Sequence, residues 1–143
     1  MEDPYDLHRF LGAQEETYAL ALREIRGGHK SSHWMWFVFP QLQGLGASSI
    51  SRRFGISGSG EAGAYLAHPT LGPRLVEISE ALLDLDAGSA HDIFGSPDDL
   101  KLKSCATLFA AVSPPGSVFE RVLARYFDGG RDPRTLKLMN PNP

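Results

Sequence analysis

The sequence predicts an all-α fold, a compact single-domain bundle of about six to eight helices, several of them short, over residues 1–143. Helix-starting patterns recur along the chain, among them two Asp-Pro openings and two Ser-led ones. Between these starts, apolar residues recur at steps of three or four, which is the spacing of one helical face. No two strand-like segments joined by a hairpin turn occur in the sequence.

The first helix is expected to begin after Asp3 and to end at the glycine pair 27–28. Asp3 suits the N-cap, and the proline that follows it suits the first helical position. The apolar stripe of this helix consists of Leu7, Leu11, Tyr18, Leu22 and Ile25. Gln14 falls within that stripe, where an unsatisfied amide would cost about 1–3 kcal/mol. Gln14 is therefore either a buried amide bonded to the backbone or a residue that lines a pocket.

Residues 29–41, HKSSHWMWFVFPQ, combine a strongly apolar run with polar ends and contain both tryptophans of the chain. Periodicity does not separate a buried strand from a short buried helix. Because helices are expected on both sides, we expect a short buried helix from about His33, with the two preceding serines as possible caps. The run is either a core element with ordinary polar ends or a pocket wall that carries Lys30, His33 and Gln41. The sequence favours the pocket wall.

Further helices are expected toward the C-terminus. Their segments are SGEAGAYLAHP from Ser59, LGPRLVEISEALLDL from residue 71, SAHDIF near residue 90, SPDDLKLKSCATLFAAV from Ser96, SVFERVLARYF from Ser117, and DPRTLKL from Asp132. The pattern at Ser117 is that of a capping box in which Glu120 reaches back. Before these helices, GLGASS at residues 44–49 is either a plain connection that ends in a serine N-cap or a loop whose backbone approaches a ligand.

Two groups of polar residues suggest a binding site. Lys30 before the apolar run and His33 in its first turn would form an anion site at a helix N-terminus. Alternatively, Lys30 is solvated and His33 bonds a carbonyl. In DDLKLKSCATLF, Lys101 and Ser104 share one helical face and Thr107 lies on a neighbouring one. They form either an inward-facing polar strip or a set in which the hydroxyls bond the preceding turn.

Composition excludes several classes of partner. The net charge of −3 and the pI near 5.9 provide no basic field for nucleic acid or a membrane surface. The longest apolar run, residues 34–40, is far shorter than the roughly 20 residues of a membrane span, and the N-terminus lacks the apolar region of a signal peptide. The single cysteine, Cys105, excludes an internal disulfide and is expected to be buried. We expect a soluble cytoplasmic protein, monomeric or weakly homo-oligomeric.

Known catalytic and metal-binding signatures are absent from the sequence. It contains no HExxH, GxSxG or CxxC motif, no phosphate loop and no dinucleotide-binding fingerprint. Its 5 histidines are scattered along the chain. No metal and no cofactor is therefore expected.

The segment KSSHWMWFVFPQLQGLGASS resembles the hallmark of the domain-of-unknown-function family 1810. The resemblance continues in order through DLHRFLGAQ, EAGAYLAHPTLGPRL, IFGSPDDLKLKSCATLF and YFDGGRDPRTL, over nearly the whole chain. It implies a compact helical bundle and brings no established reaction. The polar positions of the family pattern are here Gln14, Lys30, His33, Gln41, Glu61, Tyr65, His68, Arg74, Asp98, Lys101, Ser104, Thr107, Asp132 and Thr135.

Three functions fit these residues. The first is an enzyme acting on a phosphorylated or nucleotide-like small molecule, for example one derived from ADP-ribose or NAD, in a pocket lined by the HWMWF segment. Its anionic ligand would be bound by Gln14, Lys30, Trp34, Trp36, Gln41, Arg74, Lys101, Ser104 and Thr107. His33 would carry the proton, with Asp98 or Glu61 orienting it or acting as the base. The second function is a non-catalytic ligand-binding or regulatory module, and the third is a helical protein-interaction domain.

Overall fold

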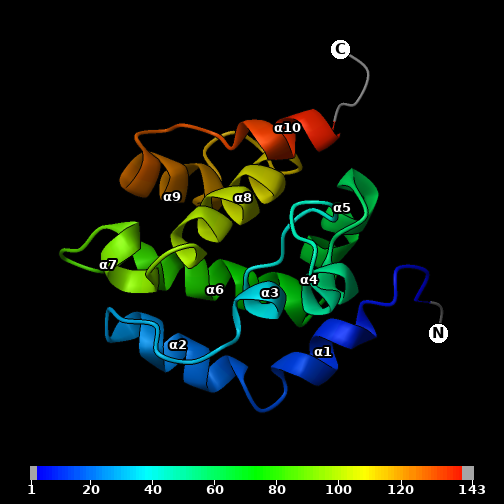
Figure 1. The fold of residues 1–143 in the computed structure, drawn as a ribbon, viewed down its shortest axis with the longest axis horizontal. Helices are drawn as coiled ribbons and strands as arrows, with labels where there is room; N and C mark the ends of the chain where they lie inside the picture. Colours follow the sequence, from blue (N-terminus) through cyan, green and yellow to red (C-terminus); the bar gives the residue numbers. More distant parts are fainter. Residues whose placement is uncertain (1–2, 140–143) are drawn as a thin grey trace.

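Ten α-helices make up the part of the chain that the computed structural model describes, residues 3–139 (Figure 1). In chain order they are α1 His8–Gln14, α2 Tyr18–Arg26, α3 Met35–Val38, α4 Ser49–Phe54, α5 Ser59–Ala67, α6 Leu71–Leu83, α7 Ala90–Phe94, α8 Asp98–Ala111, α9 Val118–Phe127 and α10 Pro133–Met139. The fold is all-helical and compact, as the sequence predicts. Within residues 3–139, no helix is long and apolar enough to cross a membrane.

The number of helices exceeds the expected six to eight, partly because the first expected helix is divided into α1 and α2. Asp6 has a φ of 52°, and the Asp3 carboxylate accepts the backbone N–H groups of Leu7 and His8 at 2.8 and 3.0 Å. The expectation that Asp3 is the N-cap is therefore wrong: α1 begins at His8 with Leu7 as N-cap, and Asp3 binds the N–H groups at its start from a preceding turn. A turn after Gln14 then separates the two helices, which lets α1 pack on α3 while α2 packs on α6.

The other additional helix is α4, in a stretch where only a connection and a serine cap were expected. Of the two serines at 48 and 49 that could cap it, Ser48 is the N-cap and accepts a backbone N–H at 3.2 Å. Expected caps are confirmed at Ser117 and Asp132, whose side chains accept backbone N–H bonds at 3.3 and 3.0 Å. The capping box expected at Ser117 is incomplete, because Glu120 accepts the N–H of Gly116 instead. α8 also begins without the side-chain cap expected from the serine before it.

A chain of buried aromatic side chains ties four helices together. The ring centroids of Phe10 in α1 and Tyr65 in α5 are 5.1 Å apart, and those of Tyr65 and Phe109 in α8 are 5.4 Å apart. Phe109 continues to Phe119 in α9 at 5.6 Å. Around this core, α6 packs against α2, α5 and α9 (Figure 1), and Cys105 of α8 is buried as expected. These contacts join α8 to α5 and α9, while α1 at the other end of the aromatic chain packs on α3.

The apolar run of residues 34–39 contains a helix of only four residues, which begins at Met35 rather than at His33. Within the run, Trp36 and Phe37 are partly exposed and the other four residues are buried in the core. The buried residues are Trp34, Met35, Val38 and Phe39. The expected short buried helix is therefore confirmed on one side of the run, while Trp36 and Phe37 on the other side line a hollow.

Candidate functional site

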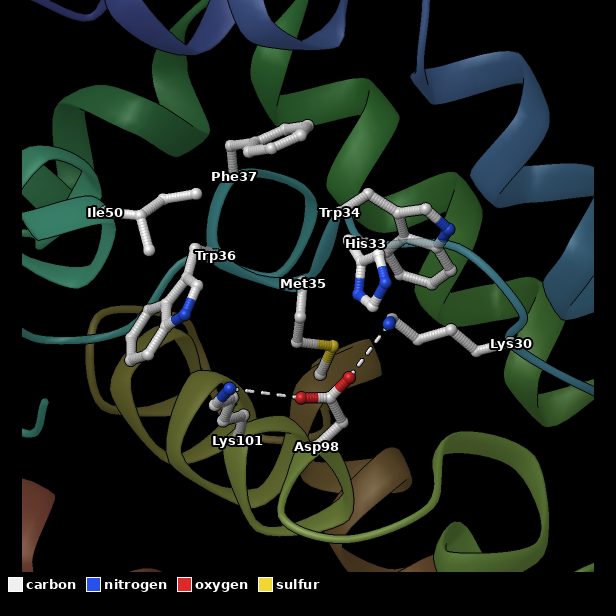
Figure 2. Close-up of a pocket in the computed structure, with 9 residues that line it drawn as sticks. All are labelled: Lys30, His33, Trp34, Met35, Trp36, Phe37, Ile50, Asp98 and Lys101. Atoms are coloured by element: carbon white, nitrogen blue, oxygen red, sulfur yellow. Dashed lines mark hydrogen bonds and ion pairs between the residues drawn. The ribbon is translucent and has the colours of Figure 1, made fainter. Parts of the chain in front are cut away.

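A hollow of about 230 Å³ lies beside α3, between this helix and the beginning of α8 (Figure 2). Its walls come from the loop before α3, from α3 itself, from α4 and from the first turn of α8. The lining residues are Lys30, His33, Trp34, Met35, Trp36, Phe37, Ile50, Asp98 and Lys101. Segments far apart in the sequence thus meet at one site.

The loop that carries Lys30 and His33 is held by a carboxylate from α2. Glu24 accepts the backbone N–H groups of Ser31 and Ser32 at 2.9 and 3.1 Å, the Ser32 hydroxyl at 2.6 Å, and the indole N–H of Trp34 at 3.0 Å. Burial raises the pKa of the Glu24 carboxyl, but these hydrogen bonds outweigh burial and lower the pKa to about 2. The sequence suggested Ser31 and Ser32 as possible caps of α3. They bind Glu24 instead and do not cap this helix.

Asp98 at the start of α8 lies between two lysines. Its carboxylate is 2.8 Å from the ammonium of Lys30 and 3.1 Å from that of Lys101. Burial raises the pKa of Asp98, but the hydrogen bonds and charges of the two lysines outweigh burial and lower the pKa below its ordinary value. Asp98 is therefore a fixed negative charge at neutral pH, and two lysines against one carboxylate leave one positive charge in excess.

The two lysines differ in how much of their hydrogen-bonding capacity is used. Lys30 is nearly buried and also donates to the carbonyl of Ser32 at 2.5 Å. Lys101 is more exposed, and Asp98 is its one acceptor among the described residues. Its ammonium lies 4.6 Å from the centre of the Trp36 ring, in a cation–π contact. Because an ammonium has three N–H donors, Lys101 has donors left for a ligand.

His33 lies at the edge of the same hollow. Figure 2 shows it opposite Trp36, with Met35 between them and Asp98 beneath. The residue is exposed, and within residues 3–139 its imidazole makes no hydrogen bond to Asp98 or Glu61. Neither carboxylate orients His33 as the sequence suggested. The imidazole is instead open to a molecule in the hollow.

A second hollow, of about 350 Å³, is also lined by Trp36. Trp36 and Lys101 line both hollows, so the two adjoin. The other lining residues are Gln41, Leu45, Gly46, Pro97, Leu100, Ser104, Asp132 and Arg134. Gly46 belongs to the GLGASS loop, and a Cβ at this position would lie 2.9 Å from the Trp36 ring. The loop thus approaches the site by packing against its aromatic wall.

Eight of the twelve residues proposed from the sequence line these two hollows. Six of them, Lys30, His33, Trp34, Trp36, Asp98 and Lys101, line the first. Gln41 and Ser104 line the second. Trp34 is buried and donates its indole N–H to Glu24, so Trp36 is the tryptophan available for stacking. Because α3 has only four residues, the anion site expected at its N-terminus is not formed as such.

Gln14, Arg74 and Glu61 line neither hollow. Gln14 is a buried amide bonded to backbone, since it donates to the carbonyl of Phe37 at 2.7 Å. Arg74 donates to Gln14 at 3.3 Å and lies over the Tyr18 ring. Glu61 is buried against Arg9, with an N–O distance of 2.7 Å. These three residues contribute to the fold around the site and do not line it.

The hydroxyls of Ser104 and Thr107 in α8 bond carbonyls of the preceding turn, which was one of the two alternatives. Thr107 donates to the carbonyl of Lys103 at 2.8 Å and accepts the backbone N–H of Asp132 at 2.9 Å. Ser104 donates to the carbonyl of Leu100 at 3.1 Å, in the preceding turn. Thr107 lines neither hollow, and its contact with Asp132 fixes the start of α10 beside the second one.

The residues proposed for the site did not include Asp132 and Arg134, which line the second hollow, or Glu24, which holds the loop before α3. For Glu24 a signal existed, because an acidic residue in the last turn of a helix is disfavoured by the helix dipole and needs another reason to be there. Arg134 lies in a short polar helix start with no distinguishing pattern. Within residues 3–139, no three His, Cys, Asp or Glu side chains gather as metal ligands would.

The fold and the site define a class of small all-helical proteins in which polar and aromatic side chains meet beside a four-residue helix. The chain belongs to the family described as protein of unknown function (DUF1810), whose pattern it matches over residues 4–139. It is similar to the conserved hypothetical protein Rv1873 from Mycobacterium tuberculosis, known from a crystal structure. The two are 50% identical with a TM-score of 0.94, over 96% of this chain and 98% of that chain. Among curated proteins no significant match is found.

Proposed function

We propose that the protein binds a phosphorylated or nucleotide-like small molecule in the hollow beside α3, with Lys101 as the anion-binding group and Trp36 as the aromatic wall. The observation that carries this proposal is the position of the Lys101 ammonium, which lies 4.6 Å from the Trp36 ring centre and lines both hollows. Ligand pockets commonly combine such an aromatic wall with a few placed polar groups.

The ion cluster favours an anion over a neutral ligand. Lys30 and Lys101 face a single carboxylate, that of Asp98, so one positive charge is unbalanced. Asp98 holds the Lys101 ammonium in place while using only one of its donors. A phosphate oxygen would accept the remaining N–H bonds in a charge-assisted contact, which is stronger than a neutral hydrogen bond.

His33 gives this proposal a catalytic version, an enzyme that acts on the bound molecule, such as one derived from ADP-ribose or NAD. The observation that favours it is an exposed imidazole lining the hollow, with no hydrogen bond to Asp98. Imidazole is the side chain best suited to move a proton near neutral pH. Because its pKa is lowered, Asp98 would act as a fixed charge and His33 as the proton carrier.

Calorimetric titration with inorganic phosphate, AMP and ADP-ribose tests the proposal. We expect at least one phosphorylated compound to bind, more weakly as salt is added. Lys101→Met keeps the apolar stem and removes the charge, so affinity should fall about ten- to a hundred-fold. Lys137→Met, an exposed position on α10 outside both hollows, is the matched control and should bind like the parent. Unchanged affinity in Lys101→Met would contradict the proposal.

Turnover separates the two versions of the proposal. In the catalytic version, the parent converts a compound that it binds, and His33→Ala retains most of the binding but loses turnover. If the parent binds a phosphorylated compound and converts none of those tested, the non-catalytic module is the better description.

A further inference from the structure

The second hollow contains a buried amide that lacks a partner. Gln41 is 2% exposed, and its Nε2 has no hydrogen-bond partner within residues 3–139. A buried polar group left in this state costs about 1–3 kcal/mol, and folded proteins leave few of them. The backbone carbonyl of Gln41 accepts the N–H of Ile56 at 2.8 Å. This bond ties the main chain at Gln41 to Ile56, while the buried Nε2 of the side chain remains to be paired.

The surroundings of Gln41 suit a flat group with apolar faces and a polar edge. Trp36, Leu45 and Leu100 provide apolar wall, and Leu100 is 59% exposed at the rim. Gln41 itself lines the hollow. The last torsion of a glutamine side chain is soft, so its amide has rotational freedom to meet a ligand there.

The hollow also contains a fixed hydrogen-bond acceptor. Asp132 accepts the backbone N–H of Thr135 at 3.0 Å through Oδ2. The Ser104 hydroxyl, which donates to Leu100, lies 3.3 Å from the same oxygen. The Thr135 hydroxyl donates to the same oxygen at 2.5 Å. Its other oxygen, Oδ1, takes part in no hydrogen bond among the described residues. A donor and an acceptor thus lie in one partly apolar hollow.

We propose that this hollow holds the heterocyclic base of a nucleotide, with Gln41 donating to an acceptor atom of the base. The inference rests on the proposed function, which places the phosphate at Lys101. It adds that the ligand is a nucleotide rather than a sugar phosphate or an inorganic anion. Since Lys101 and Trp36 line both hollows, one molecule reaches from the anion site into the base compartment. Amide side chains pair with base edges, and aromatic rings stack on base faces.

Titrations of the parent, Gln41→Leu and Gln43→Leu with AMP, ribose phosphate and adenosine test this inference. Gln43 is exposed two residues further along the same loop, so it is a matched control. The parent should bind AMP about tenfold more tightly than ribose phosphate, as one additional hydrogen bond predicts. Gln41→Leu should lose most of this preference while its affinity for ribose phosphate is unchanged, and Gln43→Leu should keep it in full.

The outcomes separate the base compartment from the anion site. Equal affinities of the parent for AMP and ribose phosphate, or a preference undiminished in Gln41→Leu, would overturn the base compartment and leave the anion site intact. Conversely, adenosine that binds the parent but not Gln41→Leu, with no effect of the phosphate or of Lys101→Met, would support the base compartment and contradict the anion site.

Thermal unfolding without ligand is a second readout. Gln41→Leu replaces a lone amide by an apolar side chain beside an apolar wall, so the unfolding midpoint should stay the same or rise. A clear fall would mean that the amide is already satisfied within the fold, for example by a bound water, and would overturn the inference.

Discussion

The Lys30 ammonium lies 2.8 Å from the Asp98 carboxylate and joins the loop before α3 to the first residue of α8. The two side chains are 7% and 19% exposed, so water screens the pair weakly. Five helices, α3 to α7, separate the two residues along the chain. The pair is therefore a long-range tether that holds two walls of the hollow against each other (Figure 2).

Removing the charge of Lys30 should destabilise the protein. Lys30→Met leaves Asp98 partly buried with Lys101 alone, so we expect the free energy of unfolding to fall by about 1–3 kcal/mol. Urea unfolding measures this loss, and Lys137→Met should unfold like the parent. Removing the Asp98 charge as well, in Lys30→Met/Asp98→Asn, should recover part of the loss. A Lys30→Met variant as stable as the parent would show that the pair is no tether.

The stability of the loop before α3 should depend on pH through Glu24. The folded-state pKa of Glu24 is about 2, below its ordinary 4.5. Its contribution is therefore present above pH 4.5 and is lost as the pH falls from 4.5 toward 2. Glu24→Gln should be less stable than the parent at neutral pH and should lose less stability over this range. Denaturant unfolding at several pH values measures both slopes, with Glu16→Gln, an exposed position, as control. Parallel slopes for the parent and Glu24→Gln would refute this role.

Gly46 should control the position of the Trp36 ring. A Cβ at Gly46 would lie 2.8 Å from the Ser51 hydroxyl and 2.9 Å from the Trp36 ring, so Gly46→Ala must displace one of them. We expect Gly46→Ala to lower the affinity for a bound nucleotide severalfold while the helical content is retained. Gly63→Ala in α5 is the control, because no atom outside its own helix lies within 4 Å of the added methyl group. Equal affinities in the two variants would indicate that Trp36 is not the aromatic wall.

The helices were predictable because their signals are local. Ser117 and Asp132 begin their helices as expected, since a side-chain cap and the following apolar stripe lie within a few residues. The division of the first helix was not predictable in this way. Its apolar stripe is continuous through Leu11 and Tyr18, but α1 and α2 pack on different neighbours.

The candidate site was predictable as a set of residues but not as a set of contacts. Lys30 and Lys101 were expected in one pocket because each is a polar residue beside an apolar run. The packing of α8 against the loop places Asp98 between the two lysines. This packing also leaves Lys30 with few free hydrogen-bond donors. Arg74 carries the same charge and was expected with them, but its contacts are with Gln14 and Tyr18. The positive charge alone therefore did not distinguish Arg74 from the two lysines that line the site.

The indole N–H resonances of the two tryptophans give the most direct test of ligand binding at Trp36. The Trp34 indole donates to Glu24 and is buried, whereas Trp36 lines both hollows, so Trp34 serves as an internal reference. Trp36→Phe assigns the two signals in a proton–nitrogen correlation spectrum. On titration with AMP, the Trp36 signal should shift progressively and saturate while the Trp34 signal moves little, and Lys101→Met should require more AMP for the same shift. A Trp36 signal that stays in place at saturating AMP, or a shift unaffected by Lys101→Met, would contradict the proposed site.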